Sequence, residues 1–277
     1  MTAATAQELL RIHDDQLRTA AELDGATDTG RIGPLWVGRF GPHGFISYRD
    51  LAGLRGEELD HLIAAGIAWF AADPAVEDVE WKTRGHDAPA DLARHLLAAG
   101  FTAQDPETVM IGEAALLLAA AGTAPDGVAV RRAGSTAAGI EADIAGVAEL
   151  HATVFHRPVD DQADALRRVL AHGDGDQVWL AEADGSVVSA GRLARVAGTR
   201  FAGLFGGATL PQWRRRGVYR QLTAARAAAA LDLGADLLYA ECTAFSRPIL
   251  ARAGLVAVTT TTPYLWRREG DAATAGP

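Results

Sequence analysis

Apolar positions along the second half of the chain follow two different spacings. Short runs rich in Val, Leu, Ala and Phe, bounded by turn-forming residues, predict strands. They occupy residues 128–132, 178–183, 187–196, 201–210, 237–242 and 260–266. Apolar residues three or four positions apart predict helices at 140–156, 161–171, 218–234 and 247–253. The Asp184-Gly185 pair between two of the strands predicts a hairpin.

The first half of the chain carries a similar order of elements. Its pattern predicts helices at 58–72 and 91–99 and strands at 79–83 and 108–111. Leu-Leu-Ala-Ala-Gly-Phe at 96–101 also matches Leu-Ala-Arg-Ala-Gly-Leu at 250–255. A match this short and alanine-rich can arise by chance. The shared order of helix, strand, short helix, glycine and strand nevertheless favours a duplicated fold.

A stretch containing Gly and Pro at 121–127 interrupts these periodic segments. The alternation of helices and strands on both sides of it predicts an α/β fold. We therefore expect a first lobe at 1–121, a linker at 122–127, a second lobe at 128–268 and a loose tail at 269–277.

Composition narrows the functional classes. Hydrophobic residues make up 49% of the 277 residues and charged residues 22%, as in globular proteins. The net charge of -9 argues against a nucleic-acid partner and mildly favours cationic small molecules. Cys242 has no second cysteine to pair with, and the apolar runs at 63–72 and 114–121 are too short to span a membrane. Carboxylates such as Glu8 argue against a signal peptide, so we expect a cytoplasmic protein with no membrane partner.

A dense group of arginines runs against this acidic background. Arg214, Arg215, Arg216 and Arg220 surround Gly217 where a predicted strand gives way to a predicted helix. A glycine loop that enters a helix presents unpaired N–H groups and the positive end of the helix dipole. Guanidinium groups beside them favour a phosphate or pyrophosphate. The alternative is a surface loop with solvated arginines.

The strand at 201–210, Pro211 and the arginine loop resemble the acyl-CoA motif of the GNAT N-acyltransferase superfamily. In that motif Arg/Gln-x-x-Gly-x-Gly/Ala opens a helix; Arg214 and Gly217 match it, whereas Tyr219 stands where Gly or Ala is usual. The resemblance covers residues 128–267 and implies a mixed sheet flanked by helices. It also implies a tandem protein with a degenerate first lobe.

The resemblance implies acetyl-CoA as cosubstrate, with no metal. The pantetheine arm is expected along a strand that Gly206-Gly207 marks as a bulge or as a point of close approach. The residues expected to bind the cosubstrate are Gly207, Ala208, Thr209, Arg214, Arg215, Arg216, Gly217, Val218, Tyr219, Arg220 and Thr243.

Acyl transfer to an amine also needs a base for the amine proton and an acid for the leaving thiolate. Candidate bases are Glu182, expected on a strand next to the cofactor strand, and Glu241; His151 and His156 are further candidates. Many members of the family carry a tyrosine acid four residues before the glycine of the closing helix, where this chain has Leu250.

Two other hydroxyls are candidates for that missing acid. They are Tyr264, on the last strand, and Ser246, which can instead cap the helix that follows it. The ordinary alternatives are solvated carboxylates, packed histidines and a half-buried tyrosine.

The first lobe has an equivalent loop at 51–56, but Glu57, Glu58 and Asp60 follow it. Carboxylates in a first helical turn repel a pyrophosphate, so we expect no CoA site there. The whole pattern predicts an N-acetyltransferase that acts on the amine of a small molecule. Its rival is a silent lobe that binds acyl-CoA as a sensor. The P-loop, His-Glu-x-x-His and Gly-x-Ser-x-Gly motifs are absent. Oligomeric state cannot be predicted.

Overall fold

The computed structural model describes residues 4–136, 139–171 and 175–268, and divides the chain into two compact lobes. Among these residues, the first lobe comprises 4–109 together with 258–268, and the second lobe comprises 110–257. The predicted linker at 122–127 therefore lies inside the second lobe. The predicted tail at 269–277 lies outside the described residues.

The first lobe is a sheet covered by helices. Its helical segments are α1 (Ala6–Gln16), η1 (Ala20–Leu23), α2 (Gly56–Ala71) and α3 (Leu92–Ala98). Its strands are β1 (Asp28–Ile32), β2 (Leu35–Phe40), β3 (His43–Ser47), β4 (Asp78–Arg84), β5 (Thr102–Ala103) and most of β12 (Val256–Arg267). They follow the order β1-β2-β3-β4-β12, with β5 also paired to β12. Trp81 and Phe70 are among the large side chains buried in its core.

The second lobe has a longer sheet. Its strands are most of β6 (Glu107–Glu113), β7 (Ala129–Arg132), β8 (Asp176–Ala183), β9 (Ser186–Arg195), β10 (Phe201–Thr209) and β11 (Leu237–Cys242). Its helical segments are α4 (Ala114–Ala119), α5 (Gly139–Phe155), α6 (Val159–Ala171), η2 (Pro211–Trp213), α7 (Val218–Asp232) and α8 (Arg247–Ala253). The strands follow the order β6-β11-β10-β9-β8-β7. The predicted mixed sheet is confirmed, because β10 and β11 are parallel whereas β7 to β10 are antiparallel.

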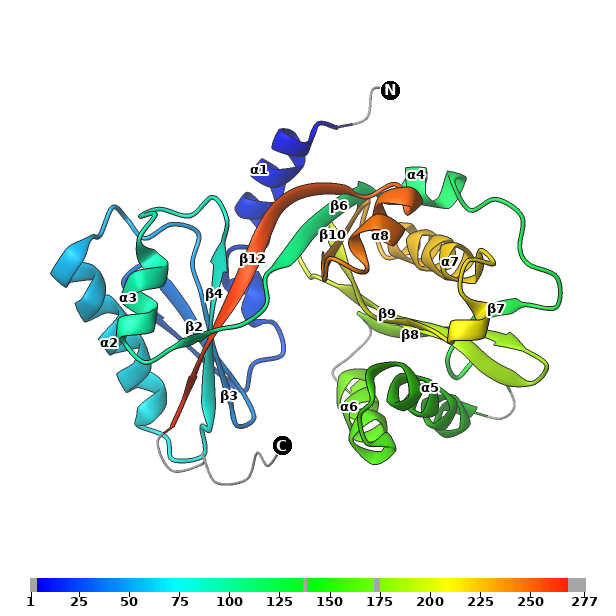
Figure 1. Cartoon of the computed structure of the whole chain (residues 1–277), viewed down its shortest axis with the longest axis horizontal. Coiled ribbons are helices and arrows are strands. Elements are labelled where there is room, and N and C mark those ends of the chain that lie inside the picture. The colour runs from blue at the N-terminus through cyan, green and yellow to red at the C-terminus, as the bar shows by residue number, and fades with distance from the viewer. Residues whose placement is uncertain (1–3, 137–138, 172–174, 269–277) are drawn as a thin grey trace. The chain divides into compact units, whose positions relative to one another are not determined.

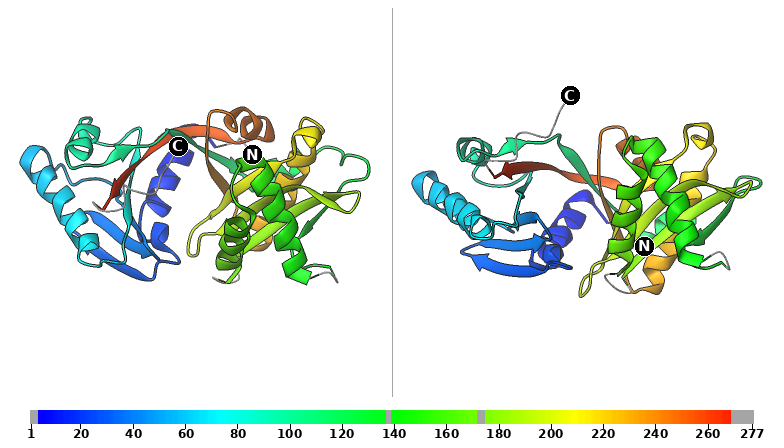
Figure 2. Two further views of the ribbon diagram at one scale, coloured as in Figure 1. Left: turned by 60° about the horizontal axis from the view of Figure 1, so that its bottom comes forward. Right: turned by 90° about the horizontal axis from the view of Figure 1, so that it is seen from below.

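Helices cover both faces of the second lobe's sheet (Figure 1; Figure 2). α7 packs on one face and α5 with α6 on the other, against β8, β9 and β10. Small residues permit the close approach: a Cβ on Gly146 of α5 would lie 2.8 Å from Val187. On the α7 side, a Cβ on Gly191 would lie 2.6 Å from the guanidinium of Arg226.

The same order of elements occurs in both lobes. β1-β2-β3-α2-β4-α3 in the first lobe corresponds to β8-β9-β10-α7-β11-α8 in the second. In both, an antiparallel meander is followed by a helix that returns the chain to a parallel strand, β3 with β4 and β10 with β11. The predicted duplication is confirmed.

Each lobe receives one strand from the other half of the sequence. β6 follows the helix α3 of the first lobe, yet it pairs with β11 in the second. β12 follows the helix α8 of the second lobe, yet residues Thr261–Arg267 pair with β4 in the first. The division of the chain therefore falls within β6 and near the start of β12, and a single linker does not separate the lobes.

Candidate functional site

The two parallel strands of the second lobe separate along their length. β10 and β11 are paired in register only as far as Gly203 opposite Tyr239. Beyond that pair β10 continues to Thr209 and β11 to Cys242. We call this diverging part of the two strands the split. It leaves the edge of β10 at 204–209 without a register partner on the β11 side within the described part of the chain.

A bulge shapes β10 inside the split. The pairing of β10 with β9 shifts between Phe205 and Ala208, and Gly206 has φ +57°, a left-handed conformation that favours glycine. The predicted bulge is therefore confirmed. A Cβ on the next residue, Gly207, would lie only 2.6 Å from the hydroxyl of Tyr219, so this side chain lies directly against the strand there.

The far end of β10 is fixed by side chains. The Ser189 hydroxyl donates to the carbonyl of Ala208 at 2.7 Å and lies 2.8 Å from the Thr209 hydroxyl. Arg214 then donates from Nε to the carbonyl of Thr209 at 3.1 Å. Strand end and arginine loop are thus tied together, and the loop leaves β10 in a defined direction.

The loop enters α7 through backbone that suits an anion. Gly217 is the N-cap residue with φ 86°, and no side chain in the described part of the chain caps it. Because the first N–H groups of a helix have no intrahelical acceptor, the amides of Val218, Tyr219 and Arg220 are donors at the positive end of the helix dipole. Arg215 is also left-handed, at φ +61°, which turns the loop sharply.

The arginine side chains lie around this helix start. Arg214, Arg215, Arg216 and Arg220 are all exposed. Arg216 stacks over the Trp213 ring at 4.9 Å, and Arg214 lies 5.9 Å from the ring centroid of Phe245, which itself is 69% exposed. Cationic groups and unpaired amides therefore meet at one end of the split.

Glu182 is not on a strand next to β10, because β9 lies between β8 and β10. Its carboxylate accepts from Arg131 Nε at 2.8 Å and Nη2 at 2.6 Å, and Arg131 also binds Asp143. Hydrogen bonds and charge from Asp143 and Glu182 raise the pKa of Arg131 above its ordinary value, although burial opposes them. Both carboxylate oxygens of Glu182 are bonded to Arg131, so the structure places Glu182 in an ion cluster away from β10.

Glu241 lies where the prediction requires a base. It is half-buried on β11, two residues beyond Tyr239, so both side chains point to the same face of the sheet. The Tyr239 ring lies 5.8 Å from that of Phe205 on β10. The catalytic role of Glu241 stays a prediction, but its position on the open part of the split favours it.

The remaining predicted residues divide between the lobes. Tyr264 is paired with Trp81 in the first lobe's sheet and is 8% exposed within its core, so packing accounts for it. Ser246 is the N-cap residue of α8, although its hydroxyl makes no capping bond. Thr243 is exposed at the end of β11, and its carbonyl accepts from the amides of Ser246 and Arg247 at 3.1 and 3.0 Å.

His151 on α5 contacts the bulge directly. It is 8% exposed, and its Nε2 lies 3.0 Å from the carbonyl of Gly206. Burial lowers its pKa, against the smaller effect of this hydrogen bond. Because a carbonyl only accepts, Nε2 carries a proton. His151 therefore supports the bulge by a hydrogen bond to the backbone, a contact that sequence spacing cannot show.

The first lobe has an equivalent split with a different content. β3 and β4 are paired in register as far as Ile46 opposite Trp81. Beyond this pair, Arg18, which is 2% exposed, donates to the carbonyl of Tyr48 at 3.1 Å and to Asp87 at 2.7 Å. Arg18 thus bridges the two strand ends from the segment between α1 and η1.

Glu22 of η1 makes a second bridge across the same strand ends. It accepts from the buried guanidinium of Arg84 at 2.6 Å and from the hydroxyl of Ser47. We call Arg18 and Glu22 together the bridge of the first lobe. Four protein groups at these strand ends are thus bound by the chain itself, which is consistent with the expectation that this lobe has no CoA site.

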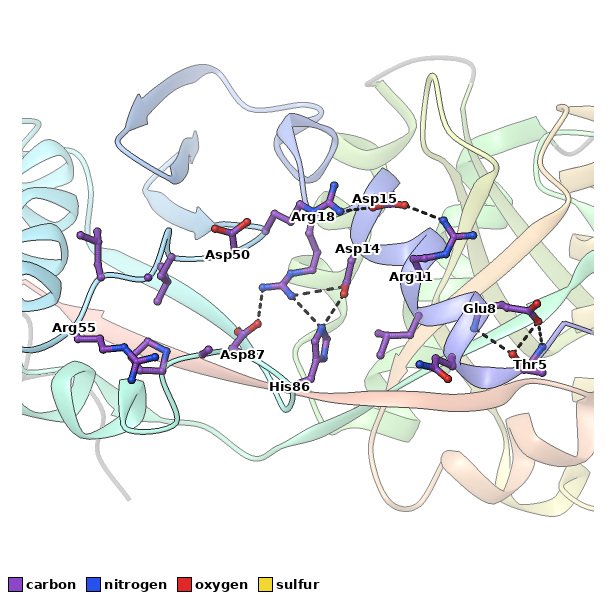
Figure 3. Close-up of a pocket in the computed structure, with 18 residues that line it drawn as sticks. Thr5, Glu8, Arg11, Asp14, Asp15, Arg18, Asp50, Arg55, His86 and Asp87 are labelled. Carbon is purple, nitrogen blue, oxygen red and sulfur yellow. Dashed lines mark hydrogen bonds and ion pairs between the residues drawn. The ribbon is translucent and has the colours of Figure 1, made fainter.

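Beside the bridge lies a pocket of about 780 Å³ within the first lobe. Figure 3 shows Arg18 pointing toward Asp14, His86 and Asp87 in its wall. The Nη1 of Arg18 lies 3.2 Å from His86, which is 2.9 Å from Asp14. Burial raises the pKa of Asp14, but hydrogen bonds and charge from its neighbours lower it overall. These charged groups satisfy one another, in contrast to the exposed arginines of the second lobe.

Comparison with known proteins identifies the second lobe. Residues 144–251, which include β10, the arginine loop and α7, match the sequence model of the acetyltransferase (GNAT) family. This part of the second lobe is similar in sequence to GNAT acetyltransferases. No curated protein sequence matches it.

Solved structures resemble both lobes. A GCN5-related N-acetyltransferase from Kribbella flavida is 18% identical, with a TM-score of 0.67 over 92% of this chain and 95% of its own. A tandem GNAT protein from the clavulanic acid biosynthesis pathway is 14% identical, with a TM-score of 0.62 over 100% of this chain and 98% of its own. At these identities the likeness establishes the fold, and the prediction of a tandem GNAT fold is confirmed.

The family match over residues 144–251 supports acyl-CoA-dependent acyl transfer in general. The described residues contain no helix long and apolar enough to cross a bilayer. They also contain no group of three or more His, Cys, Asp or Glu side chains arranged to hold a metal ion.

Proposed function

We propose that the second lobe transfers an acetyl group from acetyl-CoA to the amine of a small molecule by direct attack on the thioester. The observation that supports this most is the open edge of β10 at 204–209, which leads to the uncapped start of α7. A cosubstrate with amide groups at one end and a pyrophosphate at the other suits these two surfaces in that order.

The residues present fit such a cosubstrate. Backbone groups of Gly207, Ala208 and Thr209 can pair with the pantetheine amides as an added strand does. The amides that open α7, together with the exposed guanidinium groups of Arg214–Arg216, suit the pyrophosphate. Gly217 matters because a side chain at φ 86° is strained and would stand in front of these amides.

The acceptor amine must reach the thioester from the face of the split that Tyr239 and Glu241 share. Glu241 is our preferred base for the proton that the amine loses, directly or through water. The net charge of -9 favours an acceptor that carries further amino groups. N–H groups of the bulged strand polarise the thioester carbonyl as it becomes an oxyanion.

One experiment separates this function from the rival. Calorimetry with CoA tests binding, and release of free thiol from acetyl-CoA in the presence of a panel of amines tests transfer. We expect both binding and thiol release with at least one polyamine or amino sugar. An acyl-CoA sensor, which the absence of a tyrosine at Leu250 favours, would bind CoA and release no thiol. Absence of CoA binding would contradict both functions.

A further inference from the structure

We propose that the side chain of Tyr219 is the acid that protonates the departing thiolate, in place of the tyrosine missing at Leu250. This inference rests on the proposed function and assigns a chemical role within the same site. Leu250 is 3% exposed in the core of the second lobe, so α8 supplies no proton donor there.

The phenol of Tyr219 lies directly on the cofactor strand. Tyr219 is the second residue of α7, and an ideal Cβ on Gly207 would lie 2.6 Å from its hydroxyl and 2.9 Å from its Cε2. The side chain therefore lies over the backbone of β10 next to the bulge at Gly206. At the motif position where Gly or Ala is usual, this chain carries a hydroxyl that lies against β10 at Gly207.

The order of the site brings the sulfur to that hydroxyl. The pyrophosphate belongs at the start of α7, which follows Thr209 through the arginine loop. The pantetheine arm then runs back along β10, away from Thr209 and toward the last strand pair at Gly203. Its sulfur end must therefore lie toward the inner part of the split, where Gly206, Gly207 and the Tyr219 hydroxyl meet.

The buried guanidinium of Arg226 packs against the ring of Tyr219. Arg226 is fully buried, with its guanidinium carbon 5.5 Å from the centroid of the Tyr219 ring. Its hydrogen bonds go to the carbonyls of Leu222 and Arg192 and to the hydroxyl of Thr223, each at 3.3 Å. All three acceptors are neutral, and burying a charge without a counterion is costly. A phenolate formed at Tyr219 would find a stabilising positive charge already in place.

The transfer step uses Tyr219 as the acid and Glu241 as the base. The amine nitrogen forms a bond to the thioester carbon, the carbon–sulfur bond breaks, and its electron pair goes to sulfur. The Tyr219 hydroxyl gives its proton to that sulfur, which leaves as a thiol. The attacking nitrogen loses its proton to Glu241, and solvent carries this proton back to the Tyr219 phenolate. Arg226 is a positioning residue, because it acts through Tyr219.

Binding of CoA and of desulfo-CoA tests the contact without knowledge of the acceptor. At about pH 9 a free thiol with an ordinary pKa near 8.5 is largely thiolate. We expect the wild-type protein to bind CoA roughly tenfold more tightly than desulfo-CoA, because a hydroxyl donates to the thiolate. In Tyr219→Phe the two ligands should bind equally, with desulfo-CoA affinity unchanged within about twofold.

Tyr239→Phe is the matched control, because Tyr239 also carries a phenol but lies on β11, in the last pair before the split begins. It should keep the preference for CoA, whereas Arg226→Gln should reduce that preference by about half. If Tyr219→Phe keeps the preference, or Tyr239→Phe removes it, Tyr219 is not the acid. If the wild-type protein binds neither ligand, the proposed function itself is wrong, so the two failures are distinguishable.

A kinetic readout follows once an acceptor amine is known. Tyr219→Phe should lower kcat by roughly 10- to 100-fold while the KM for acetyl-CoA changes less than about twofold. A rise in KM with unchanged kcat would show that Tyr219 only shapes the binding surface, and would overturn the proposal.

Discussion

The two lobes build the same parallel strand pair and fill the space beyond it differently. In the second lobe β10 and β11 diverge after Gly203, and His151 of α5 contacts the carbonyl of Gly206 on β10. In the first lobe β3 and β4 diverge after Ile46, and Arg18 and Glu22 connect both strand ends. Both sets of contacts come from segments that precede the meander in sequence, α5 in the second lobe and residues 18–22 in the first.

The lobes differ in whether the polar groups at the strand ends are bonded to side chains of the same lobe. The first lobe satisfies its strand ends with ion pairs of low exposure, since the side chains of Arg18 and Asp87 are 2% and 6% exposed. The second lobe leaves its strand edge, helix amides and arginines to solvent or ligand. The same strand arrangement is thus closed by charged side chains in one lobe and left open in the other, without loss of the underlying sheet.

Removing the bridge should give the largest effect. Arg18→Ala leaves the carboxylate of Asp87 buried without its guanidinium, which typically costs about 3–5 kcal/mol of stability. Hydrogen exchange of peptides from β3 and β4 should report this loss within the first lobe. Arg55→Ala is the control, because Arg55 is exposed and should change stability by less than about 0.5 kcal/mol. Equal effects would show that the bridge does not hold the first lobe's split closed.

Substitution of the glycine at the start of the helix should lower CoA affinity in the second lobe and not in the first. Gly217→Asp places a strained side chain and a negative charge before the α7 amides, and should weaken CoA binding by roughly 100-fold. Gly56→Asp makes the matching change at the start of α2, at φ 53°, and should leave CoA affinity unchanged within about twofold. Calorimetry measures both. Comparable losses at the two glycines would overturn the assignment of a single CoA site.

A smaller effect is expected from one guanidinium. Arg214→Ala removes a charged donor near the pyrophosphate and its bond to the carbonyl of Thr209, and should weaken CoA binding about tenfold. Its partner in the first lobe, Arg55→Ala, should have no measurable effect on CoA affinity. The two variants can be compared in the same calorimetric series. An unchanged affinity for Arg214→Ala would place the pyrophosphate elsewhere on α7.

The smallest expected effect is on the pH dependence of the protein's stability. Burial lowers the pKa of His151 below 6.5, so the folded state favours the neutral ring. The stability that His151 contributes is full above pH 6.5 and is lost as pH falls through 6.5 toward the folded value. His151→Gln should flatten this part of the unfolding free energy against pH, measured by urea denaturation. His156→Gln, at an exposed position, should leave the slope intact.

Much of the second lobe could be predicted because its elements are long and periodic. The sequence pattern predicted β11 and α8 with the bounds that the structure has. The region before residue 48 was harder, since β1 to β3 are short, carry Gly30, Gly38 and Gly44, and lie beside polar turns. The exchange of β6 and β12 was also not predicted, because spacing along the chain does not show which sheet a strand joins.

Within the site, the arginine loop could be read from sequence because its parts are contiguous. The charged clusters could not. Arg131, Asp143 and Glu182 come from three elements, so sequence alone left Glu182 looking like a free base. The burial of Arg226 could have been predicted from its spacing. It lies four residues after Leu222, on the apolar face of an alanine-rich helix, where a charged side chain is unusual.

The exchange of strands also determines when the first lobe can complete its sheet during synthesis. β4 acquires its neighbour at residues 261–267 only after all the residues of the second lobe have been synthesised. Domains usually fold as they emerge, N-terminal one first. Here β4 must wait, without one of its two neighbours, until β12 has been made. A ribosome that stalls within α8 would release a nascent protein whose first half still lacks the strand that pairs with β4.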